Sequence, residues 1–218
     1  MPGAHRVIAI DGPAASGKSS VARELARQIG FAYVNSGAMY RAATWFVLQQ
    51  NVSVEDAEKI AALIDRVDLR CDLAKGESRI FIDGVDPTPF LRDDAVNEAV
   101  SAVSSVPRIR ERLVEQMRAY ALSHDVVMEG RDIGSVVFRD TPFKFYIDAS
   151  PEVRAQRRQA QGQRDQIAAR DQADSSRRDS PLMISDDADV IDSSSLSIEE
   201  VVREIIKSLK AKGLKVSR

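Results

Sequence analysis

Residues 7–19, VIAIDGPAASGKS, decide the fold of this chain. The apolar residues 7–10 predict a buried strand, and residues 20–29 place apolar side chains at helical spacing. Between them, residues 12–19 match G-x-x-x-x-G-K-[ST], the pattern of a phosphate-binding loop. The motif requires a strand before it and a helix after it, and the sequence predicts both. We therefore expect an α/β fold that carries a phosphate site near the start of the chain.

The chemistry of this loop follows from its residue types. Glycines let backbone N–H groups converge on phosphate oxygens, and the N-terminus of the following helix adds partial positive charge. Lys18 is placed to reach the outer phosphates, and the Ser19 hydroxyl is placed to bind Mg²⁺. A chance loop of small residues would not explain the flanking strand and helix.

Composition excludes several classes of protein. The chain has 218 residues, 44% apolar and 29% charged, which is typical of one medium globular domain. A net charge of −2 gives no support for a surface that coats nucleic acid. The single cysteine, Cys71, excludes an intramolecular disulfide and is typical of a reducing compartment. Without an apolar stretch long enough to span a membrane, and without a signal-peptide pattern, we expect a cytoplasmic protein.

Predicted strands and helices alternate along the rest of the chain. Further strands are predicted at 31–34, 126–128, 143–147 and 190–191, and helices at 38–49, 57–67, 95–104, 107–123, after Pro151 and after the capping box Ser197-x-x-Glu200. Together with the first strand they predict a doubly wound parallel sheet of five strands.

The segment 68–90 departs from this alternation. Residues 69–73 and 78–82 are two short β-like runs joined by a tight turn. Such strands pair antiparallel, which fits a parallel sheet poorly. We predict a small β insertion on the parent domain, with membership of the main sheet as the alternative.

Several charged residues lie where a ligand is expected. Glu129, Arg131 and Asp132 follow a predicted strand, and open α/β sheets bind ligands beyond the carboxyl ends of their strands. Arg41, in the first turn of its predicted helix, is poorly placed for the helix dipole and is interpreted as facing an anion, with a solvated surface arginine as the alternative. Arg110 shares a helix face with apolar residues, so it requires a polar partner. That partner is either an internal salt bridge or a ligand.

A dense run of charges surrounds residue 170. Arg170, Asp174 and Arg177 are spaced to form one stripe on a helix, whereas Asp171 and Arg178 form a neighbouring stripe. A solvated helix face is the usual meaning of such a run, and both stripes would then be equally dispensable.

Seven stretches carry a resemblance to a known family. They are IDGPAASGKSS (10–20), NSGAMYR (35–41), SSVPRIRERL (104–113), EGRDIGSVVF (129–138), FKFYIDAS (143–150), R-D-x-x-D-x-x-R (170–177) and DVIDSSSLSIEEVV (189–202). With these motifs in this order over nearly its whole length, the chain resembles the bacterial cytidylate kinases, a family of nucleoside monophosphate kinases with a P-loop. The phosphate loop alone indicates only the superfamily, whereas SGAMYR and EGRDIG are more discriminating.

The resemblance implies transfer of the γ-phosphoryl group of ATP to CMP or dCMP, with Mg²⁺ as cofactor. By the same resemblance, the acceptor phosphate would be held by Ser36, Arg41, Arg131 and Arg177, cytosine by Ser101, Arg110 and Asp132, and the sugar by Arg170 and Asp174. A carboxylate and an arginine suit cytosine, which offers an amine donor beside carbonyl and ring-nitrogen acceptors.

On the donor side, the resemblance implies that ATP lies along the phosphate loop. The residues are Gly12, Pro13, Ala14, Ala15, Ser16, Gly17, Lys18, Ser19 and Ser20, with Arg157 or Arg158 over the adenine. Lys18, Arg131 and Arg177 would be catalytic, and Ser19 and Glu129 (through a water) would hold the metal. The acceptor is already an anionic oxygen, so catalysis is in-line positioning and charge neutralisation without a general base.

The resemblance also implies how the chain is divided. The parts are a core of 1–67 and 91–218, a nucleotide-monophosphate-binding insertion at 68–90, and a short helical lid at 154–178 within the core. Two features depart from the family: Glu129 stands where Asp is usual, and the lid is shorter by about ten residues.

Rival functions share only part of the pattern. A shikimate- or thymidylate-type kinase would have the same phosphate loop but different acceptor residues. A GTPase switch would need an N-K-x-D motif, which the sequence lacks. We expect a monomer with small-molecule partners only, and no nucleic acid or membrane among them.

Overall fold

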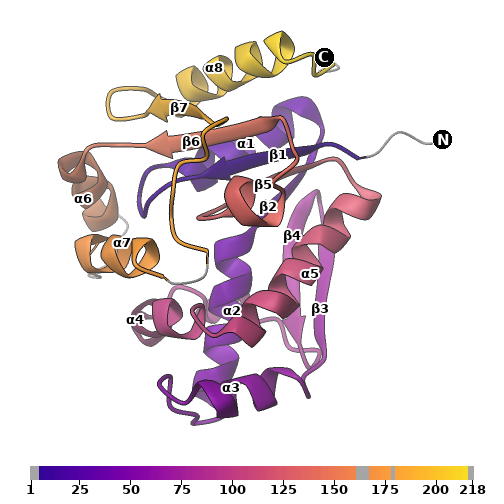
Figure 1. The fold of residues 1–218 in the computed structure, drawn as a ribbon, viewed down its shortest axis with the longest axis vertical. Helices are drawn as coiled ribbons and strands as arrows, with labels where there is room; N and C mark the ends of the chain where they lie inside the picture. Colours follow the sequence, from indigo (N-terminus) through magenta and orange to yellow (C-terminus); the bar gives the residue numbers. More distant parts are fainter. Residues whose placement is uncertain (1–4, 161–166, 178–179, 216–218) are drawn as a thin grey trace.

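A single seven-stranded sheet forms the centre of the computed structural model, which describes residues 5–160, 167–177 and 180–215 (Figure 1). Its strands are β1 (Val7–Asp11), β2 (Ala32–Asn35), β3 (Leu69–Ala74), β4 (Glu77–Ile82), β5 (Val126–Gly130), β6 (Phe143–Asp148) and β7 (Asp189–Asp192). They lie in the order β3-β4-β2-β5-β1-β6-β7, and only the β3–β4 pair is antiparallel. The predicted α/β fold with a parallel-dominated sheet is confirmed.

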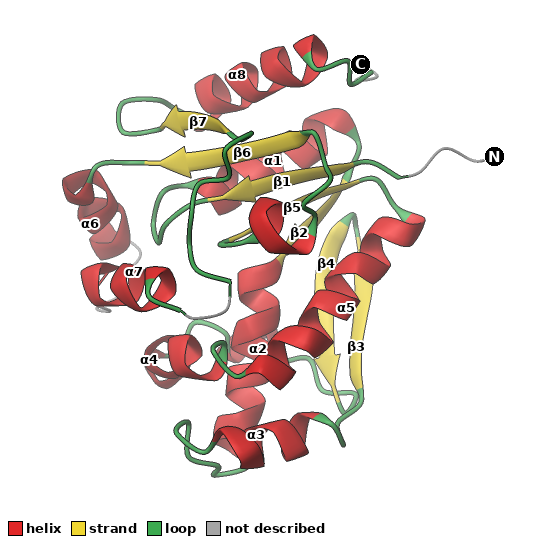
Figure 2. Ribbon diagram, viewed as in Figure 1, coloured by secondary structure: helices red, strands yellow, loops and turns green. Residues whose placement is uncertain are grey.

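Helices separate most of the strands along the chain (Figure 2). They are α1 (Lys18–Ile29), α2 (Ser36–Gln49), α3 (Ala57–Ile64), α4 (Asp94–Val103), α5 (Pro107–Ser123), α6 (Pro151–Ala160), α7 (Ile167–Ser175) and α8 (Ile198–Ala211), with short turns η1 (Thr88–Phe90) and η2 (Ile133–Val137). The predicted capping box is present at the start of α8, where Ser197 and Glu200 exchange hydrogen bonds. The sequence did not predict η1 or the π-helical turn η2.

The strand β1 is buried on both faces because its side chains alternate between two hydrophobic cores. Ile8 and Ile10 pack with residues of α1 and α8 on one face of the sheet. Val7 and Ala9 belong to the core on the other face, which α2 and α5 complete. The chain that follows β1 is thus anchored from both sides.

The β3–β4 hairpin corrects the prediction of five strands. β4 joins the parallel sheet through one pairing, Tyr33 with Glu77 of β4, and the Tyr33 N–H donates to the Gly76 carbonyl at 2.8 Å. The hairpin is antiparallel within itself, yet only the start of β4 meets β2. The alternative that the segment belongs to the main sheet is therefore correct.

The helix α2 begins two residues earlier than predicted. The Asn35 side chain accepts a hydrogen bond from the Ala38 N–H at 2.9 Å and so caps a helix that starts at Ser36. Arg41 therefore lies in the second turn, and the helix-dipole interpretation of Arg41 was wrong.

The carboxyl ends of the parallel strands point toward α6 and α7 (Figure 1). β1 lies between β5 and β6, so the strand order reverses at its carboxyl end. Open α/β sheets bind ligands at such a switch point. Among the helices that the structure describes, none is long and apolar enough to cross a membrane.

Candidate active site

The phosphate loop owes its shape to two glycines. A Cβ atom on Gly12 would lie 2.1 Å from the carbonyl oxygen of Ile147, so only glycine lets the loop leave β1 this close to β6. Gly17 has φ 91° and precedes α1, where no side chain caps the helix. The first N–H groups of α1 and its positive end therefore offer an anion-binding site.

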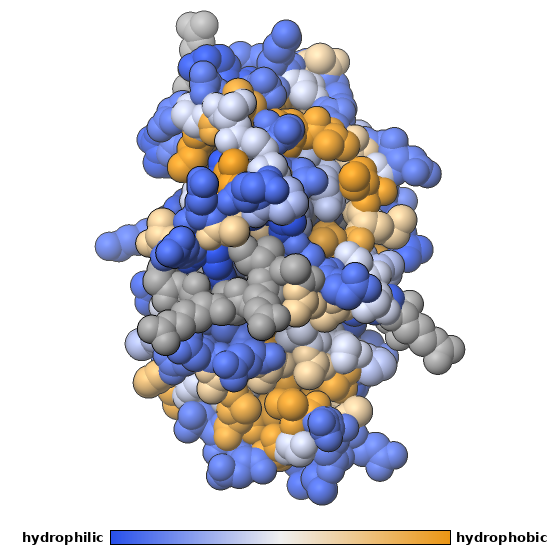
Figure 3. All heavy atoms as spheres, turned by 90° about the vertical axis from the view of Figure 1, so that its left-hand side faces the viewer, coloured by the Kyte–Doolittle hydropathy of each residue, from blue (hydrophilic) through white to orange (hydrophobic). Residues whose placement is uncertain are grey.

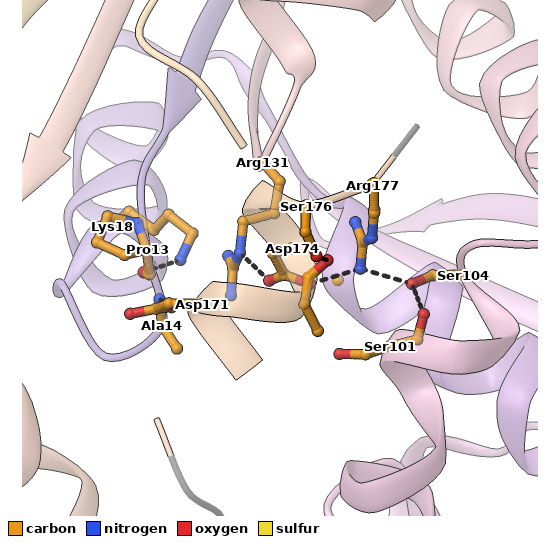
Figure 4. A network of polar contacts seen from close by, with 12 residues as sticks. Pro13, Ala14, Lys18, Ser101, Ser104, Arg131, Asp171, Asp174, Ser176 and Arg177 are labelled. Atoms are coloured by element: carbon orange, nitrogen blue, oxygen red, sulfur yellow. Dashed lines mark hydrogen bonds and ion pairs between the residues drawn. The ribbon is translucent and has the colours of Figure 1, made fainter. Parts of the chain in front are cut away.

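Lys18 and Ser19 lie where the loop meets α1. Lys18 is buried, and its Nζ donates to the Pro13 carbonyl oxygen at 2.9 Å (Figure 4). The Ser19 hydroxyl donates to Oε1 of Glu129 at 2.8 Å, at the end of β5. Hydroxyl and carboxylate oxygens are ligands that Mg²⁺ prefers, and water and nucleotide phosphates usually complete its shell. Among the described residues no cluster of three or more acidic, histidine or cysteine side chains could hold a metal by itself, so the pair fits an ion that arrives with a nucleotide.

One cavity of about 500 Å³ connects the loop with the other predicted residues. Its described lining contains residues 14–20 of the loop but neither Gly12 nor Pro13. It also contains Ser36, Arg41, Ser101, Arg110, Glu129, Arg131, Asp132, Arg157, Arg158, Asp174 and Arg177. Arg170 lies in α7, but its side chain is outside the described residues. On the face on the side of α6 and α7, hydrophilic residues lie above and below the grey atoms of the middle, and apolar patches lie farther toward the two ends (Figure 3).

The start of α2 supplies two of the predicted acceptor residues. The Ser36 hydroxyl donates to the Glu129 carbonyl oxygen at 2.7 Å, which ties α2 to the end of β5. Arg41 donates from Nη1 to the Gly37 carbonyl oxygen at 3.0 Å and contacts the Asn97 side chain at 3.5 Å. These bonds hold the Arg41 guanidinium beside the cavity.

Arg110 and Asp132 form an ion pair buried in the cavity wall. Both are at most 5% exposed, and Nη2 of Arg110 contacts Oδ2 of Asp132. The Arg110 guanidinium also lies 5.4 Å from the ring centre of Tyr40. Burial raises the pKa of the Asp132 carboxyl, while Arg110 and then Arg177 oppose that shift. The sequence prediction that Arg110 needs a polar partner is confirmed, and within the protein that partner is Asp132.

A second network joins two arginines through one carboxylate. Asp174, 2% exposed, accepts from Nε of Arg131 at 2.8 Å and from Nη2 of Arg177 at 2.5 Å (Figure 4). Nη2 of Arg177 also donates to the Ser104 hydroxyl at 2.8 Å, whereas its buried Nε has no hydrogen-bond partner among the described residues. Burial lowers the pKa of Arg177, the pairing with Asp174 opposes this, and Arg110 and Arg131 lower it further.

This end of the cavity therefore carries an excess of positive charge. Among the described residues of this end, the lining places the guanidinium groups of Arg110, Arg131 and Arg177 beside the two carboxylates of Asp132 and Asp174, while Glu129 faces Ser19 of the loop. An uncompensated buried charge is unfavourable, so the arrangement favours an anionic ligand. The arginine fork also suits the oxygens of a phosphate.

Arg157 is fixed to the backbone around the phosphate loop. It donates to the Ser16 carbonyl oxygen at 3.1 Å and to the Ser193 carbonyl oxygen at 2.7 Å. The Ser193 hydroxyl, buried after β7, donates to the same Ser16 oxygen at 2.9 Å. Sequence reasoning missed Ser193, although its position just beyond a strand end was a usable signal.

The charged run on α7 is not a solvated face. Asp171 accepts from the Ala14 N–H at 3.1 Å and pairs with Arg154. Asp171, which the sequence places on the neighbouring stripe, therefore also faces the site, because its carboxylate contacts the loop. Arg178, the other member of that stripe, lies outside the described residues.

Asp11 joins the donor and acceptor parts of the site. Its carboxylate, 5% exposed, accepts from the Ile133 and Gly134 N–H groups, each at 2.8 Å. Burial raises the pKa of Asp11 to about 7, against the two backbone hydrogen bonds. No local sequence pattern could indicate this role, because the partners lie more than 120 residues along the chain.

Comparisons with known proteins agree with this geometry. A family model described as cytidylate kinase matches residues 8–211. The chain is 43% identical over 214 residues to the cytidylate kinase of Caldanaerobacter subterraneus subsp. tengcongensis, covering 93% of this chain and 94% of that protein. It is 44% identical over 217 residues to that of Pelotomaculum thermopropionicum, covering 94% and 96%. The solved structure of TT1252 from Thermus thermophilus covers 98% of this chain and 100% of its own with a TM-score of 0.50 at 18% identity, which supports the fold alone.

Proposed function

This chain belongs to the cytidylate kinase family and phosphorylates CMP with ATP, and on that premise we propose which of its residues perform the transfer. The observation that carries the proposal is the carboxylate of Asp174 between two arginines. One negative charge does not neutralise both guanidinium groups, so a phosphate can bind there with a net gain. The phosphate loop lies at the other end of the same cavity, where ATP would present its γ-phosphoryl group.

The acceptor nucleotide is assigned three sets of contacts. Ser36, Arg41, Arg131 and Arg177 hold its phosphate, Ser101, Arg110 and Asp132 read cytosine, and Arg170 and Asp174 hold the sugar of CMP or dCMP. The pairing of Asp132 with Arg110 supports the cytosine assignment. Beside its bonds with Arg110 and Ser180, the Asp132 carboxylate has lone pairs that can accept from the exocyclic amine, and the guanidinium has N–H groups that can donate to the ring acceptors.

The donor nucleotide is assigned to residues 12–20, with Arg157 or Arg158 beside the adenine. Lys18, Arg131 and Arg177 neutralise charge that develops on the transferred group, which lies between them. Ser19 and, through a water, Glu129 would hold Mg²⁺, which when bound neutralises charge on the donor phosphates. No residue is required to remove a proton, because the acceptor oxygen is already anionic.

The remaining proposals concern the setting of the reaction. We assign the segment 68–90, whose hairpin extends the sheet of the core (1–67 and 91–218), to the acceptor side, and 154–178 to a lid. The enzyme would act as a monomer on small molecules in the cytoplasm, where ATP is available.

Ligand variants test the site without changing the protein. We expect CMP to bind at least about a hundredfold more tightly than cytidine in calorimetry, because two or more charge-assisted contacts at about 1.5–3 kcal/mol each go to its phosphate. EDTA should abolish turnover in a coupled assay with ATP while leaving the affinity for CMP unchanged. Equal binding of cytidine and CMP would contradict the arginine assignment.

A further inference from the structure

The backbone of Ala14 in the phosphate loop is bound by an ion pair from outside the loop. Oδ1 of Asp171 accepts from the Ala14 N–H at 3.1 Å, and Oδ2 of Asp171 contacts Nη1 of Arg154. The same Nη1 donates to the Ala14 carbonyl oxygen at 3.2 Å, and Nε of Arg154 donates to the Ala149 carbonyl oxygen at 3.1 Å. Both peptide groups that Ala14 offers are therefore held by one pair of side chains.

This pair is largely withdrawn from solvent. The side chains of Asp171 and Arg154 are 17% and 13% exposed. A lone carboxylate beside a phosphate loop would repel a nucleotide, but the guanidinium of Arg154 neutralises it. Asp171 is thus suited to fix the loop backbone rather than to bind a phosphate or a metal.

The helix that carries Asp171 also carries Asp174, less than one turn further along (Figure 4). Asp174 holds Arg131 and Arg177 at the acceptor end of the cavity. Residues three apart are neighbours on a helix surface, so two adjacent stripes of α7 contact the donor loop and the acceptor arginines. Three residues of helix rise by about 4.5 Å, so a displacement of α7 would shift both sets of contacts together.

We propose that Asp171, paired with Arg154, is a positioning residue that couples the ATP loop to the CMP-binding arginines through α7. A loop fixed by ATP favours the position of α7 in which Asp174 aligns Arg131 and Arg177, so each nucleotide strengthens the binding of the other. Such coupling is reciprocal. The inference rests on the proposed function, because it takes the arginine cluster to be the CMP site.

The test is a binding cycle. The affinity for CMP is measured by calorimetry with and without a saturating β,γ-imido analogue of ATP and Mg²⁺. In the native protein we expect the analogue to strengthen CMP binding about fivefold or more. The coupling ratio is the Kd of CMP without the analogue divided by its Kd with the analogue. In Asp171→Asn this ratio should fall to near one, while the affinity for CMP alone changes by less than about twofold.

A second variant and a control keep the test independent of folding defects. Arg154→Met should lower the ratio as Asp171→Asn does, and the double variant should add nothing, because the two residues act as one unit. Gln172→Ala, at an exposed position of the same helix, should keep the native ratio. A ratio of one in the native protein, or a native ratio in both Asp171→Asn and Arg154→Met, would overturn the coupling.

The outcomes separate this inference from the function on which it rests. If the native protein binds and phosphorylates CMP but Asp171→Asn and Arg154→Met both keep the native ratio, only the coupling fails. If CMP does not bind more tightly than cytidine, the assignment of the arginine site fails first.

Discussion

The phosphate loop and the acceptor end of the cavity lie at the same edge of the sheet, but they are built differently. The loop is a short continuous segment whose backbone N–H groups and helix end form the anion site. The acceptor end is made of side chains from α2, α4, α5, α7 and the end of β5, held by ion pairs. A local backbone motif serves any nucleoside triphosphate, whereas discrimination between acceptors requires side chains that the fold brings together.

The largest effect is expected on the loop side. Lys18→Ala should lower kcat by on the order of 10³ or more, because it removes a positive charge next to the transferred group. The fold should persist, since the Lys18 ammonium donates to the Pro13 carbonyl oxygen of the loop and does not belong to either hydrophobic core. Steady-state kinetics and thermal unfolding check this, and the affinity for CMP should stay native. Normal turnover by a folded variant would remove Lys18 from the mechanism.

On the acceptor side, Arg177→Ala should lower kcat at least about a hundredfold at saturating ATP and CMP, by analogy with the loss of a charge-stabilising donor. The effect falls on kcat because the charge Arg177 meets is greatest in the transition state. Arg203→Ala, at an exposed position of α8, is the matched control and should lose little. Equal and small losses in both variants would leave the acceptor end without a catalytic arginine.

Asp132→Ala should affect the two nucleotides unequally. It removes the acceptor for the cytosine amine, a bond that is worth about 1–3 kcal/mol, so CMP should bind roughly five- to 150-fold more weakly. It also leaves Arg110 buried without its partner, which costs about 3–5 kcal/mol of stability. Michaelis constants for both nucleotides and thermal melting measure these effects. An unchanged Michaelis constant for CMP together with a raised Michaelis constant for ATP would contradict the assignment of Asp132 to cytosine.

The smallest effect is expected for Asp11, whose hydrogen bonds with Ile133 and Gly134 connect the two regions. Its pKa is raised from 3.8 to about 7 in the folded protein. Between these pH values the folded state therefore holds a proton that the unfolded state has lost. The contribution of Asp11 to the free energy of unfolding is therefore fully present below about pH 4 and is lost as the pH rises through about 7. In Asp11→Asn, whose side chain stays neutral, the melting temperature should therefore depend less on pH between about 4 and 7 than in the native protein. Parallel curves for the two proteins would contradict the buried, proton-holding carboxyl.

The sequence predicts a region well when the contacts of that region join residues that are close together along the chain. Strand, loop and helix around Lys18 are local and were predicted, as was the need of Arg110 for a polar partner. The contact of Asp171 with Ala14 joins residues 157 apart, and no periodicity within α7 could indicate it. The seven-stranded sheet was missed for a related reason, since one pairing between β2 and β4 decides it.

The central claim is that discrimination lies in the acceptor side chains and not in the loop. It is tested most directly by the ratio of kcat/KM for CMP to that for UMP, in the native protein and in Asp132→Asn. Uracil carries a carbonyl where cytosine carries an amine, so the carboxylate of Asp132 should disfavour UMP and the Asn amide should accept it. We predict that the ratio falls at least about tenfold in the variant. A ratio that stays native while both activities fall together would contradict the claim.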